Sequence, residues 1–145
     1  TNGVLIYGIR PQKNIHTLNS HLNVTNMIVG DLGNVAFTGN YGFDSGSFTS
    51  YIAGRTISLK SGNTYNVSTA LSLNGSAASR MTLTSSNTGA HAYFNLSPSA
   101  SQNVKHCNGT WIDSSGGQTI YTTLASTLNN TINWGKAEGN MFLVL

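Results

Sequence analysis

Short stretches of alternating apolar and polar residues recur along most of the chain. Alternation with a period of two predicts β-strands that bury one face. The strand-like stretches are the wholly apolar VLIY at 4–7, followed by HLNVTNMIV at 21–29, NVAFT at 34–38, SFTSYI at 47–52 and several more within 56–86. Apolar residues at helical spacing persist for no more than about one turn. The pattern therefore predicts an all-β fold.

Turn-forming residues end each of these strands early. Gly-Asn, Asn-Gly, Ser-Gly and Gly-Gly pairs are typical of tight turns. They occur at Gly39-Asn40, Ser61-Gly62-Asn63, Asn74-Gly75, Asn108-Gly109 and Gly116-Gly117. Short strands joined by such turns are compatible with either a sandwich of two sheets or a coil of stacked turns.

The spacing of apolar residues favours the coil. Ile57 is followed by Met81, and Leu71 is followed by Phe94, at almost the same separation along the chain. In a solenoid, inward-facing positions recur once per turn, at a nearly fixed period of about 20 or more residues. The sequence therefore predicts a parallel β-helix with turns of about 23 residues. A β-sandwich, which does not require a constant period, is the alternative.

The composition agrees with a stack of parallel turns. Charged residues make up 8% of the chain, compared with roughly 25% in average usage. Ser, Thr, Asn and Gly replace them, and ladders of neutral polar side chains can stack without the repulsion that like charges would cause. The length of 145 residues suits a single domain with one core.

The regularity of the pattern suggests three segments within that domain. Residues 1–53 are expected to form a less regular β region or an N-terminal cap, residues 54–134 the turns of the helix, and residues 135–145 a C-terminal strand. An open solenoid end presents an unpaired strand edge that must be covered. Because the chain begins with Thr1, we expect it to be processed or cut from a longer polypeptide.

Three segments carry a resemblance to known proteins. They are GRTISLKSGNTYNVSTALSLNGSAASRMTLTSS at 54–86, AYFNLSPSASQNVKHCNGTWIDSSGGQTIY at 92–121 and NNTINWG at 129–135. Together they resemble right-handed parallel β-helix modules of bacterial surface proteins and of phage virion proteins of the tail or fibre. The chain departs from that pattern at Ile132-Asn133-Trp134, where Gly-Trp is commoner. The resemblance implies a right-handed coil that serves as a rigid spacer or surface.

Charge and apolar content argue against two kinds of partner. The formal net charge is +3, but the seven Lys and Arg residues are dispersed and form no basic stripe, so no nucleic-acid partner is expected. No apolar run approaches the roughly 20 residues of a membrane helix, so no membrane insertion is expected. The single cysteine, Cys107, is expected to be a small buried residue.

The acids and histidines give no recognisable catalytic site. Glycoside hydrolysis usually needs two carboxylates that flank one bond. Asp31, Asp44, Asp113 and Glu138 are scattered, and Asp113 is expected to cap a turn through its own backbone. The four histidines do not have the spacing of a metal site. No catalytic residue, metal or cofactor is therefore assigned, and the chain is not expected to be an enzyme.

Self-assembly is the favoured function. We expect a non-catalytic structural module on a cell surface, an extracellular filament or a virion, partnered by copies of itself in a homo-oligomer or filament. The candidate interface residues are Tyr41, Phe43, Phe48, Tyr51, Met141, Phe142, Leu143, Val144 and Leu145. The alternative for the first four is that they fill the domain's own core.

A carbohydrate-binding or polysaccharide-processing β-helix is the alternative function. Trp111 and Trp134 are the candidate stacking platforms for surface glycans, although a Trp beside alternating apolar residues more often packs in a core. Six Asn-x-Ser/Thr sequons also occur, which in a chain rich in these residues indicates only that glycosylation is possible. They begin at Asn23, Asn66, Asn74, Asn95, Asn108 and Asn129.

Overall fold

The computed structural model describes residues 4–7, 14–30, 33–123 and 126–137, and every regular element among them is a β-strand. A larger sheet contains β1 (Val4–Tyr7), β3 (Leu22–Val29), β5 (Phe43–Ser50), β7 (Thr64–Asn74), β9 (Ala92–Leu96), β10 (Ser101–Lys105), β12 (Ile112–Asp113), β13 (Ile120–Thr123) and β15 (Trp134–Ala137). A smaller sheet contains β2 (Asn14–Leu18), β4 (Val35–Gly39), β6 (Thr56–Leu59), β8 (Met81–Ser85), β11 (Cys107–Thr110) and β14 (Leu128–Asn129).

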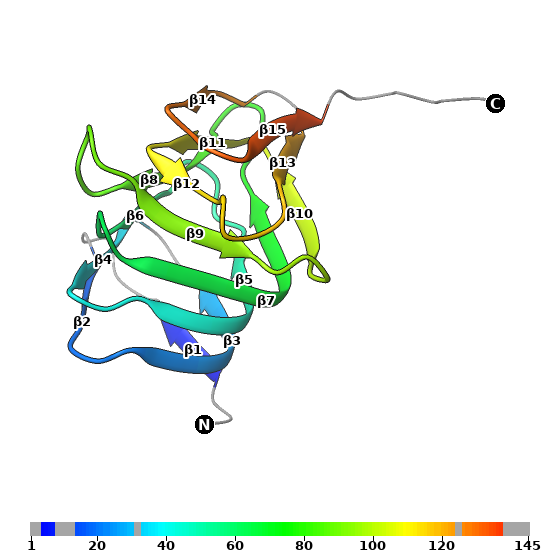
Figure 1. Cartoon of the computed structure of the whole chain (residues 1–145). Helices are drawn as coiled ribbons and strands as arrows, with labels where there is room; N and C mark the ends of the chain where they lie inside the picture. Colours follow the sequence, from blue (N-terminus) through cyan, green and yellow to red (C-terminus); the bar gives the residue numbers. More distant parts are fainter. Residues whose placement is uncertain (1–3, 8–13, 31–32, 124–125, 138–145) are drawn as a thin grey trace.

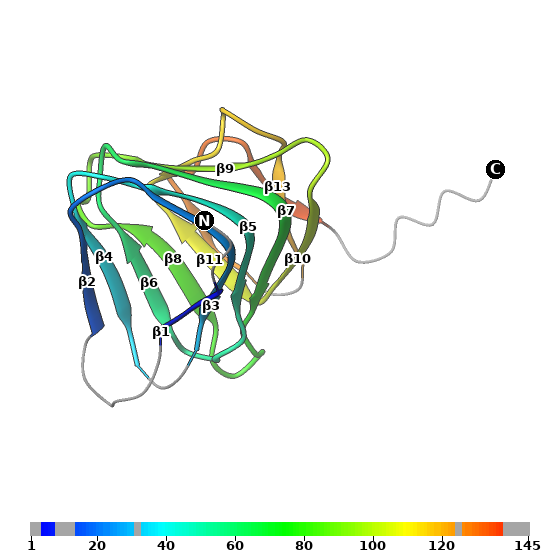
Figure 2. The same ribbon diagram turned by 90° about the horizontal axis from the view of Figure 1, so that it is seen from below.

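The chain forms a β-solenoid. It passes repeatedly between the two sheets, and every strand pairs in parallel with strands of the neighbouring turns. About five turns rise from β1 and β2 at the bottom of Figure 1 to β14 and β15 at the top. Seen from below in Figure 2, the smaller sheet forms one side of the coil and the larger sheet the other. The predicted parallel β-helix is confirmed, and the sandwich alternative is wrong.

The larger sheet divides into two branches because its long strands bend. The first part of β7, Thr64–Val67, pairs with β9, whereas the second part, Ala70–Asn74, pairs with β10. The ladder between β5 and β7 is interrupted at the bend, where its register shifts between Ser45 and Ser47. Each turn of the solenoid therefore has three walls, two of which belong to this sheet.

The turns differ in length, so several expected strand pairings are wrong. Fewer residues separate paired positions of β3 and β5 along the chain than separate paired positions of β6 and β8. Ile57 pairs with Leu83 rather than Met81, and Leu71 pairs with Gln102 rather than lying one turn below Phe94. Loops of unequal length between the strands change the spacing without disturbing the stack.

The early turns belong to the same stack as the later ones. Strand β2 pairs with β4 over its whole length in the smaller sheet, and β4 in turn pairs with β6. At the other end, β15 extends over Trp134–Ala137. The rest of the strand expected at 135–145, including all of 141–145, lies outside the described residues.

Aromatic side chains fill the centre of the coil. Phe43, Phe48 and Tyr65 are completely buried, and the Phe43 ring lies 5.6 Å from that of Phe48 and 4.9 Å from that of Tyr65. The exposed position expected for Phe43 and Phe48 is therefore corrected: both belong to the core. Alternation would place residues five apart on opposite faces, but the irregularity at Gly46 turns both rings inward.

A buried arginine joins two turns on the inside of the solenoid. Arg55 is 1% exposed, and its guanidinium donates hydrogen bonds to the carbonyl oxygens of Val29, Gly30 (2.7 Å) and Gly33 (2.9 Å). It also donates to Ser50 Oγ at 3.4 Å. The five N–H groups of arginine can satisfy several backbone carbonyls at once, and this lets the charge remain inside. Arg55 thereby links the end of β3 to Gly33, shortly before β4.

Candidate functional site

A polar groove crosses the outer surface of the larger sheet. It has a volume of about 500 Å³ and lies where β3, β5 and β7 are stacked and bent. Its lining consists of Asn23, Val24, Thr25, Asp44, Ser45, Gly46, Asn66 and Ser68. We call this feature the Asp44 groove.

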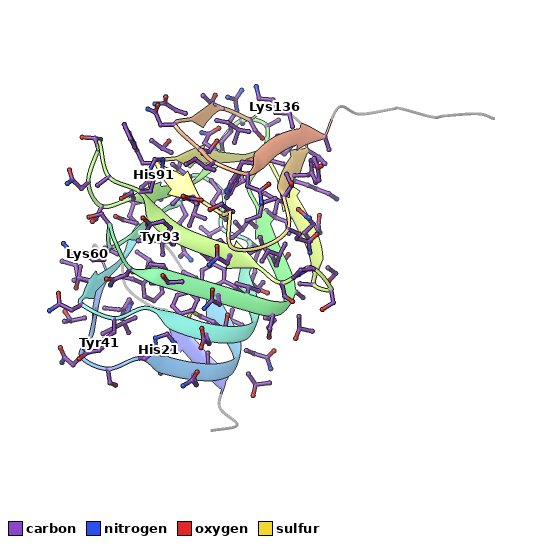
Figure 3. The ribbon with its side chains drawn as sticks, viewed as in Figure 1. His21, Tyr41, Lys60, His91, Tyr93 and Lys136 are labelled. Carbon is purple, nitrogen blue, oxygen red and sulfur yellow. The ribbon has the colours of Figure 1, made fainter. Side chains whose placement is uncertain are left out.

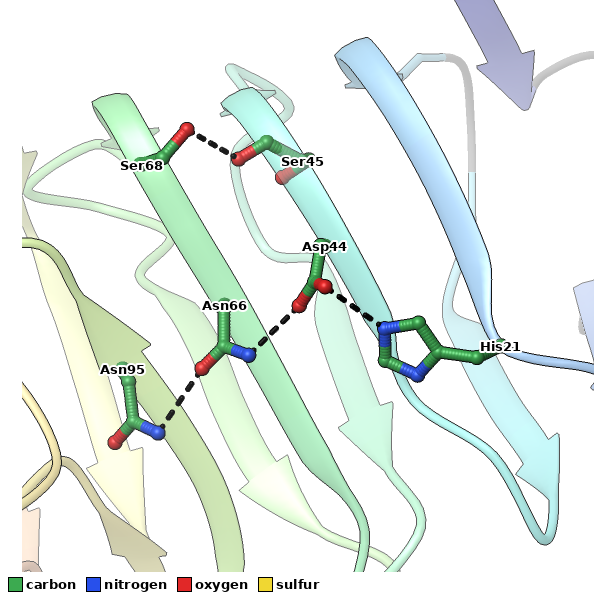
Figure 4. A network of polar contacts seen from close by, with 6 residues as sticks. All are labelled: His21, Asp44, Ser45, Asn66, Ser68 and Asn95. Atoms are coloured by element: carbon green, nitrogen blue, oxygen red, sulfur yellow. Dashed lines mark hydrogen bonds and ion pairs between the residues drawn. The ribbon is translucent and has the colours of Figure 1, made fainter. Parts of the chain in front are cut away.

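A ladder of planar polar side chains forms one side of the groove. Asp44 is in register with Asn23 on one neighbouring strand and with Asn66 on the other, and Asn66 is in register with Asn95. Asn66 Nδ2 donates to Asp44 Oδ1 at 2.7 Å, and Asn95 Nδ2 donates to Asn66 Oδ1 at 3.1 Å (Figure 4). The ladder holds these side chains in a fixed orientation.

The second carboxylate oxygen of Asp44 faces a histidine. His21 Nε2 lies 3.0 Å from Asp44 Oδ2 (Figure 4), and both side chains are partly exposed. His21 is also labelled in Figure 3. His21 immediately precedes β3, so the stacking of β3 against β5 brings the two residues together. Each oxygen of the carboxylate therefore has one polar neighbour and retains further capacity to accept hydrogen bonds.

The floor of the groove depends on a glycine. A Cβ atom at Gly46 would lie 2.4 Å from the carbonyl oxygen of Thr25, a distance that real side chains do not tolerate. One turn further on, Ser68 Oγ donates to the Ser45 carbonyl at 3.3 Å. The Ser45 hydroxyl is buried and has no hydrogen-bond partner among the described residues. Close contact between bent strands thus creates the hollow.

The side chains that line the groove offer hydrogen-bond donors and acceptors. Asp44 is its single carboxylate, whereas glycoside hydrolysis usually uses two. Asp113 is occupied elsewhere, because its Oδ1 accepts the backbone N–H of Ser115 at 2.8 Å, and this confirms the predicted turn cap. Within the described ranges, no three His, Cys, Asp or Glu side chains lie close enough to hold a metal ion. Asp31 and Glu138 lie outside those ranges.

The two tryptophans lie on later turns than the groove. Trp134, on β15, packs against the core, and its Nε1 donates to the buried Ser114 Oγ at 2.8 Å, as the core-packing alternative predicts. Trp111 adopts a positive φ of 54° between β11 and β12. Its ring lies 5.2 Å from that of His91, whose Nε2 is 3.0 Å from the Asn130 carbonyl. The groove itself is lined by neither tryptophan.

The remaining residues predicted for an assembly interface divide into two groups. Tyr41 and Tyr51 are 47% and 59% exposed and flank β5 at its two ends. Tyr93, on β9, is a further exposed tyrosine, and Figure 3 labels both Tyr41 and Tyr93. The described surface therefore carries dispersed tyrosines on several turns. Met141, Phe142, Leu143, Val144 and Leu145 lie outside the described residues.

Sequence reasoning did not identify the Asp44 groove, although a signal was present. Three of the sequons, Asn23-x-Thr25, Asn66-x-Ser68 and Asn95-x-Ser97, place their asparagines at equivalent positions of the ladder. Asp44-x-Gly46 occupies the same position on the turn between the first two. The recurrence of the motif thus reflects stacking of turns at the bend in addition to composition.

The cysteine is inert in the folded protein. Cys107 is completely buried on β11, as predicted, and burial raises the pKa of its thiol to about 12. Because the thiolate is the reactive form, the folded chain does not offer a nucleophile here. Among the described residues, no helix has the length and apolar character needed to cross a membrane.

Comparison with known proteins identifies no relative: no protein-family model, curated protein or solved structure matches the chain. The assignment of a function therefore depends on the residues and geometry described above.

Proposed function

We propose that the chain is a non-catalytic structural module that packs with copies of itself. The observation that carries this proposal is the ladder organisation of its outer polar residues, which are hydrogen-bonded to neighbouring turns. Catalytic sites instead bring acid and base groups together around a substrate. A rigid, charge-poor solenoid of this kind suits a cell surface, an extracellular filament or a virion, as does the resemblance of residues 54–135 to β-helix modules.

Hydrogen bonds between side chains support the rigidity of the module. Thr17 and Thr38 hydroxyls lie 3.0 Å apart on neighbouring turns of the smaller sheet. Ser47 Oγ donates to Asn26 Oδ1 at 2.6 Å on the larger sheet. Such cross-strand pairs contribute roughly 0.2–1 kcal/mol each. Repeated over successive turns, they stiffen the solenoid without adding net charge.

The ends of the described coil support self-association. Strand β2 pairs with β4 alone and β14 with β11 alone in this part of the chain. Unpaired strand edges are templates for another chain. Exposed apolar residues accompany both ends: Ile15 on β2 is 57% exposed, and Ile132, bridged to Asp113 in the last turn, is 44% exposed. Head-to-tail stacking of copies through these ends would produce a ring or a filament.

A charged substitution on β2 tests this proposal. Ile15→Asp should reduce the apparent mass of the purified protein in light scattering, because it would place a carboxylate on the outer face of β2, the last described strand of the smaller sheet, beside the proposed contact. Thr88→Asp, in an exposed turn between β8 and β9, is the matched control and should leave the mass unchanged. Circular dichroism checks that both variants fold. If Ile15→Asp folds and assembles like the parent chain, end-to-end packing through β2 is wrong.

A further inference from the structure

We propose that the Asp44 groove is a binding site for a neutral saccharide with vicinal hydroxyl groups. This site is independent of self-association and of the two tryptophans considered from the sequence. The inference rests on the shape of the groove, the unused hydrogen-bonding capacity of its side chains and its charge.

The ladder leaves donors and acceptors available at the groove. An asparagine amide has two N–H donors and two acceptor lone pairs, and a carboxylate has about four acceptor sites. Asn66 uses one donor toward Asp44 and one acceptor site toward Asn95. Asp44 accepts one hydrogen bond from Asn66 and faces His21 with its other oxygen. Exposed Asn23 adds a further amide at the same level of the ladder.

This inventory matches sugar hydroxyls, because each hydroxyl both donates and accepts. Planar side chains stacked on consecutive turns present their polar atoms at about the 4.8 Å strand spacing. The ladder fixes their rotamers before any ligand arrives, and preorganisation lowers the entropy cost of binding. Val24, half-buried and packed mainly against the core, contributes the small apolar part of the lining. Small ligand sites commonly combine such a surface with a few well-placed polar groups.

Two other ligand classes fit the lining less well. A calcium ion takes six to eight oxygen ligands, usually with several carboxylates, whereas Asp44 is the single carboxylate that lines the groove. An anionic ligand would be repelled by Asp44, and the lining contains neither arginine nor lysine. His21, which contacts Asp44 and does not line the groove, is already directed at that carboxylate. The observations therefore favour an uncharged saccharide.

Nuclear magnetic resonance of the side-chain amides tests the site directly. The full chain, labelled with ¹⁵N, is titrated with maltotriose, cellotriose, mannotriose and trigalacturonic acid up to about 10 mM, which exceeds a Kd of about 1 mM for a weak ligand. We expect at least one neutral trisaccharide to shift the Asn23 and Asn66 side-chain NH₂ resonances. Trigalacturonic acid should shift them less. The proposed binding site is wrong if none of the four trisaccharides shifts these resonances, or if the shifts cluster around Trp111 and His91. If only trigalacturonic acid shifts them, the proposal that the ligand is neutral is wrong.

Substitution of Asn23 distinguishes binding from folding. Asn23→Ala removes an exposed amide from the groove and should weaken the Kd about threefold to tenfold, as expected for one lost hydrogen bond. The thermal midpoint should remain unchanged. Asn87→Ala, at an exposed asparagine in the turn after β8, should alter neither quantity. Equal saccharide affinity in Asn23→Ala and Asn87→Ala would overturn the proposal.

Discussion

Asn66 donates a hydrogen bond of 2.7 Å to Asp44, its register partner on the preceding turn of the solenoid. The contact places one carboxylate within a column of amides, where His21 and Asn66 each face one of its oxygens. A second negative charge in the column would lie next to the first. The ladder therefore depends on the absence of a second carboxylate beside Asp44.

Replacement of Asn66 by aspartate should make the stability of the protein depend on pH. Two stacked carboxylates raise each other's folded-state pKa above the unfolded value of about 4. The folded state is then destabilised as the pH rises through that range, and the penalty disappears below it. We expect Asn66→Asp to lose about 1–2 kcal/mol of unfolding free energy at about pH 7 relative to the parent chain.

Chemical denaturation at pH 7 and pH 4 measures the effect, with Asn87→Asp as the control because Asn87 is exposed outside the ladder. The difference between Asn66→Asp and the parent chain should shrink at pH 4. A difference that is equal at both pH values would contradict the assigned contact between Asn66 and Asp44.

Removal of the Arg55 side chain should be among the most damaging single changes. Arg55→Ala leaves the carbonyl oxygens of buried Val29 and Gly30, and that of exposed Gly33, without this donor, and each buried unsatisfied group costs about 1–3 kcal/mol. We expect a total loss of about 3–5 kcal/mol in urea denaturation. Arg55→Lys retains the charge but not the planar fork of donors, so it should recover only part of the loss. A loss below about 0.5 kcal/mol for Arg55→Ala would place the side chain at an ordinary surface position.

The Cys107 thiol should react with Ellman's reagent only when the chain unfolds. Its side chain is completely buried and its pKa is raised to about 12, so at pH 8 the folded protein presents neither access nor thiolate. Because this pKa is higher in the folded than in the unfolded state, its contribution to stability is complete below the unfolded pKa of 9.0 and is lost as the pH rises toward about 12. Rapid stoichiometric labelling of the native protein would contradict the buried position, and labelling in denaturant provides the control.

Substitution of Gly46 by alanine should disrupt both the fold and the groove. The added methyl group would meet the backbone oxygen of Thr25 at 2.4 Å, so the bent strands must separate. We expect a loss of about 1–3 kcal/mol, as for overpacking. Gly62→Ala is the control, since its Cβ would meet nothing within 4 Å and only its positive φ of 80° causes strain, at a cost of about 1 kcal/mol. Thermal melts of both variants measure which is less stable. A Gly46→Ala variant as stable as Gly62→Ala would contradict the close contact between Gly46 and the Thr25 carbonyl oxygen.

The sequence was sufficient to predict the strands because alternation is local, and the recurrence of apolar positions at a nearly fixed spacing predicted the solenoid. Ile57 and Leu59 face the core as their alternation with polar neighbours indicates. The pairing of turns was less accessible: Ile57 pairs with Leu83 instead of Met81, since loop lengths between strands vary freely. A constant apolar period captures the stacking of turns but not their register.

The burial of Arg55 and the Asp44 groove could not be predicted from the local sequence pattern, because both depend on contacts between turns. An arginine just before a strand looks like a surface residue, and its burial depends on carbonyl groups supplied by the preceding turn. The groove lies at the bend at Gly46, and the parallel register of β3, β5 and β7 places Asn23 and Asn66, distant from each other in sequence, on either side of Asp44. Recurrent Asn-x-Ser/Thr motifs were visible, but their common ladder position requires the strand register.

The mass and shape of the purified chain in solution test the central proposal most directly. Light scattering at several concentrations, combined with negative-stain imaging, distinguishes a monomer from a closed oligomer or a filament. Self-association through the solenoid ends predicts a trimer, ring or filament whose mass exceeds that of the 15.3 kDa chain. A compact monomer at every concentration would contradict the proposed structural role.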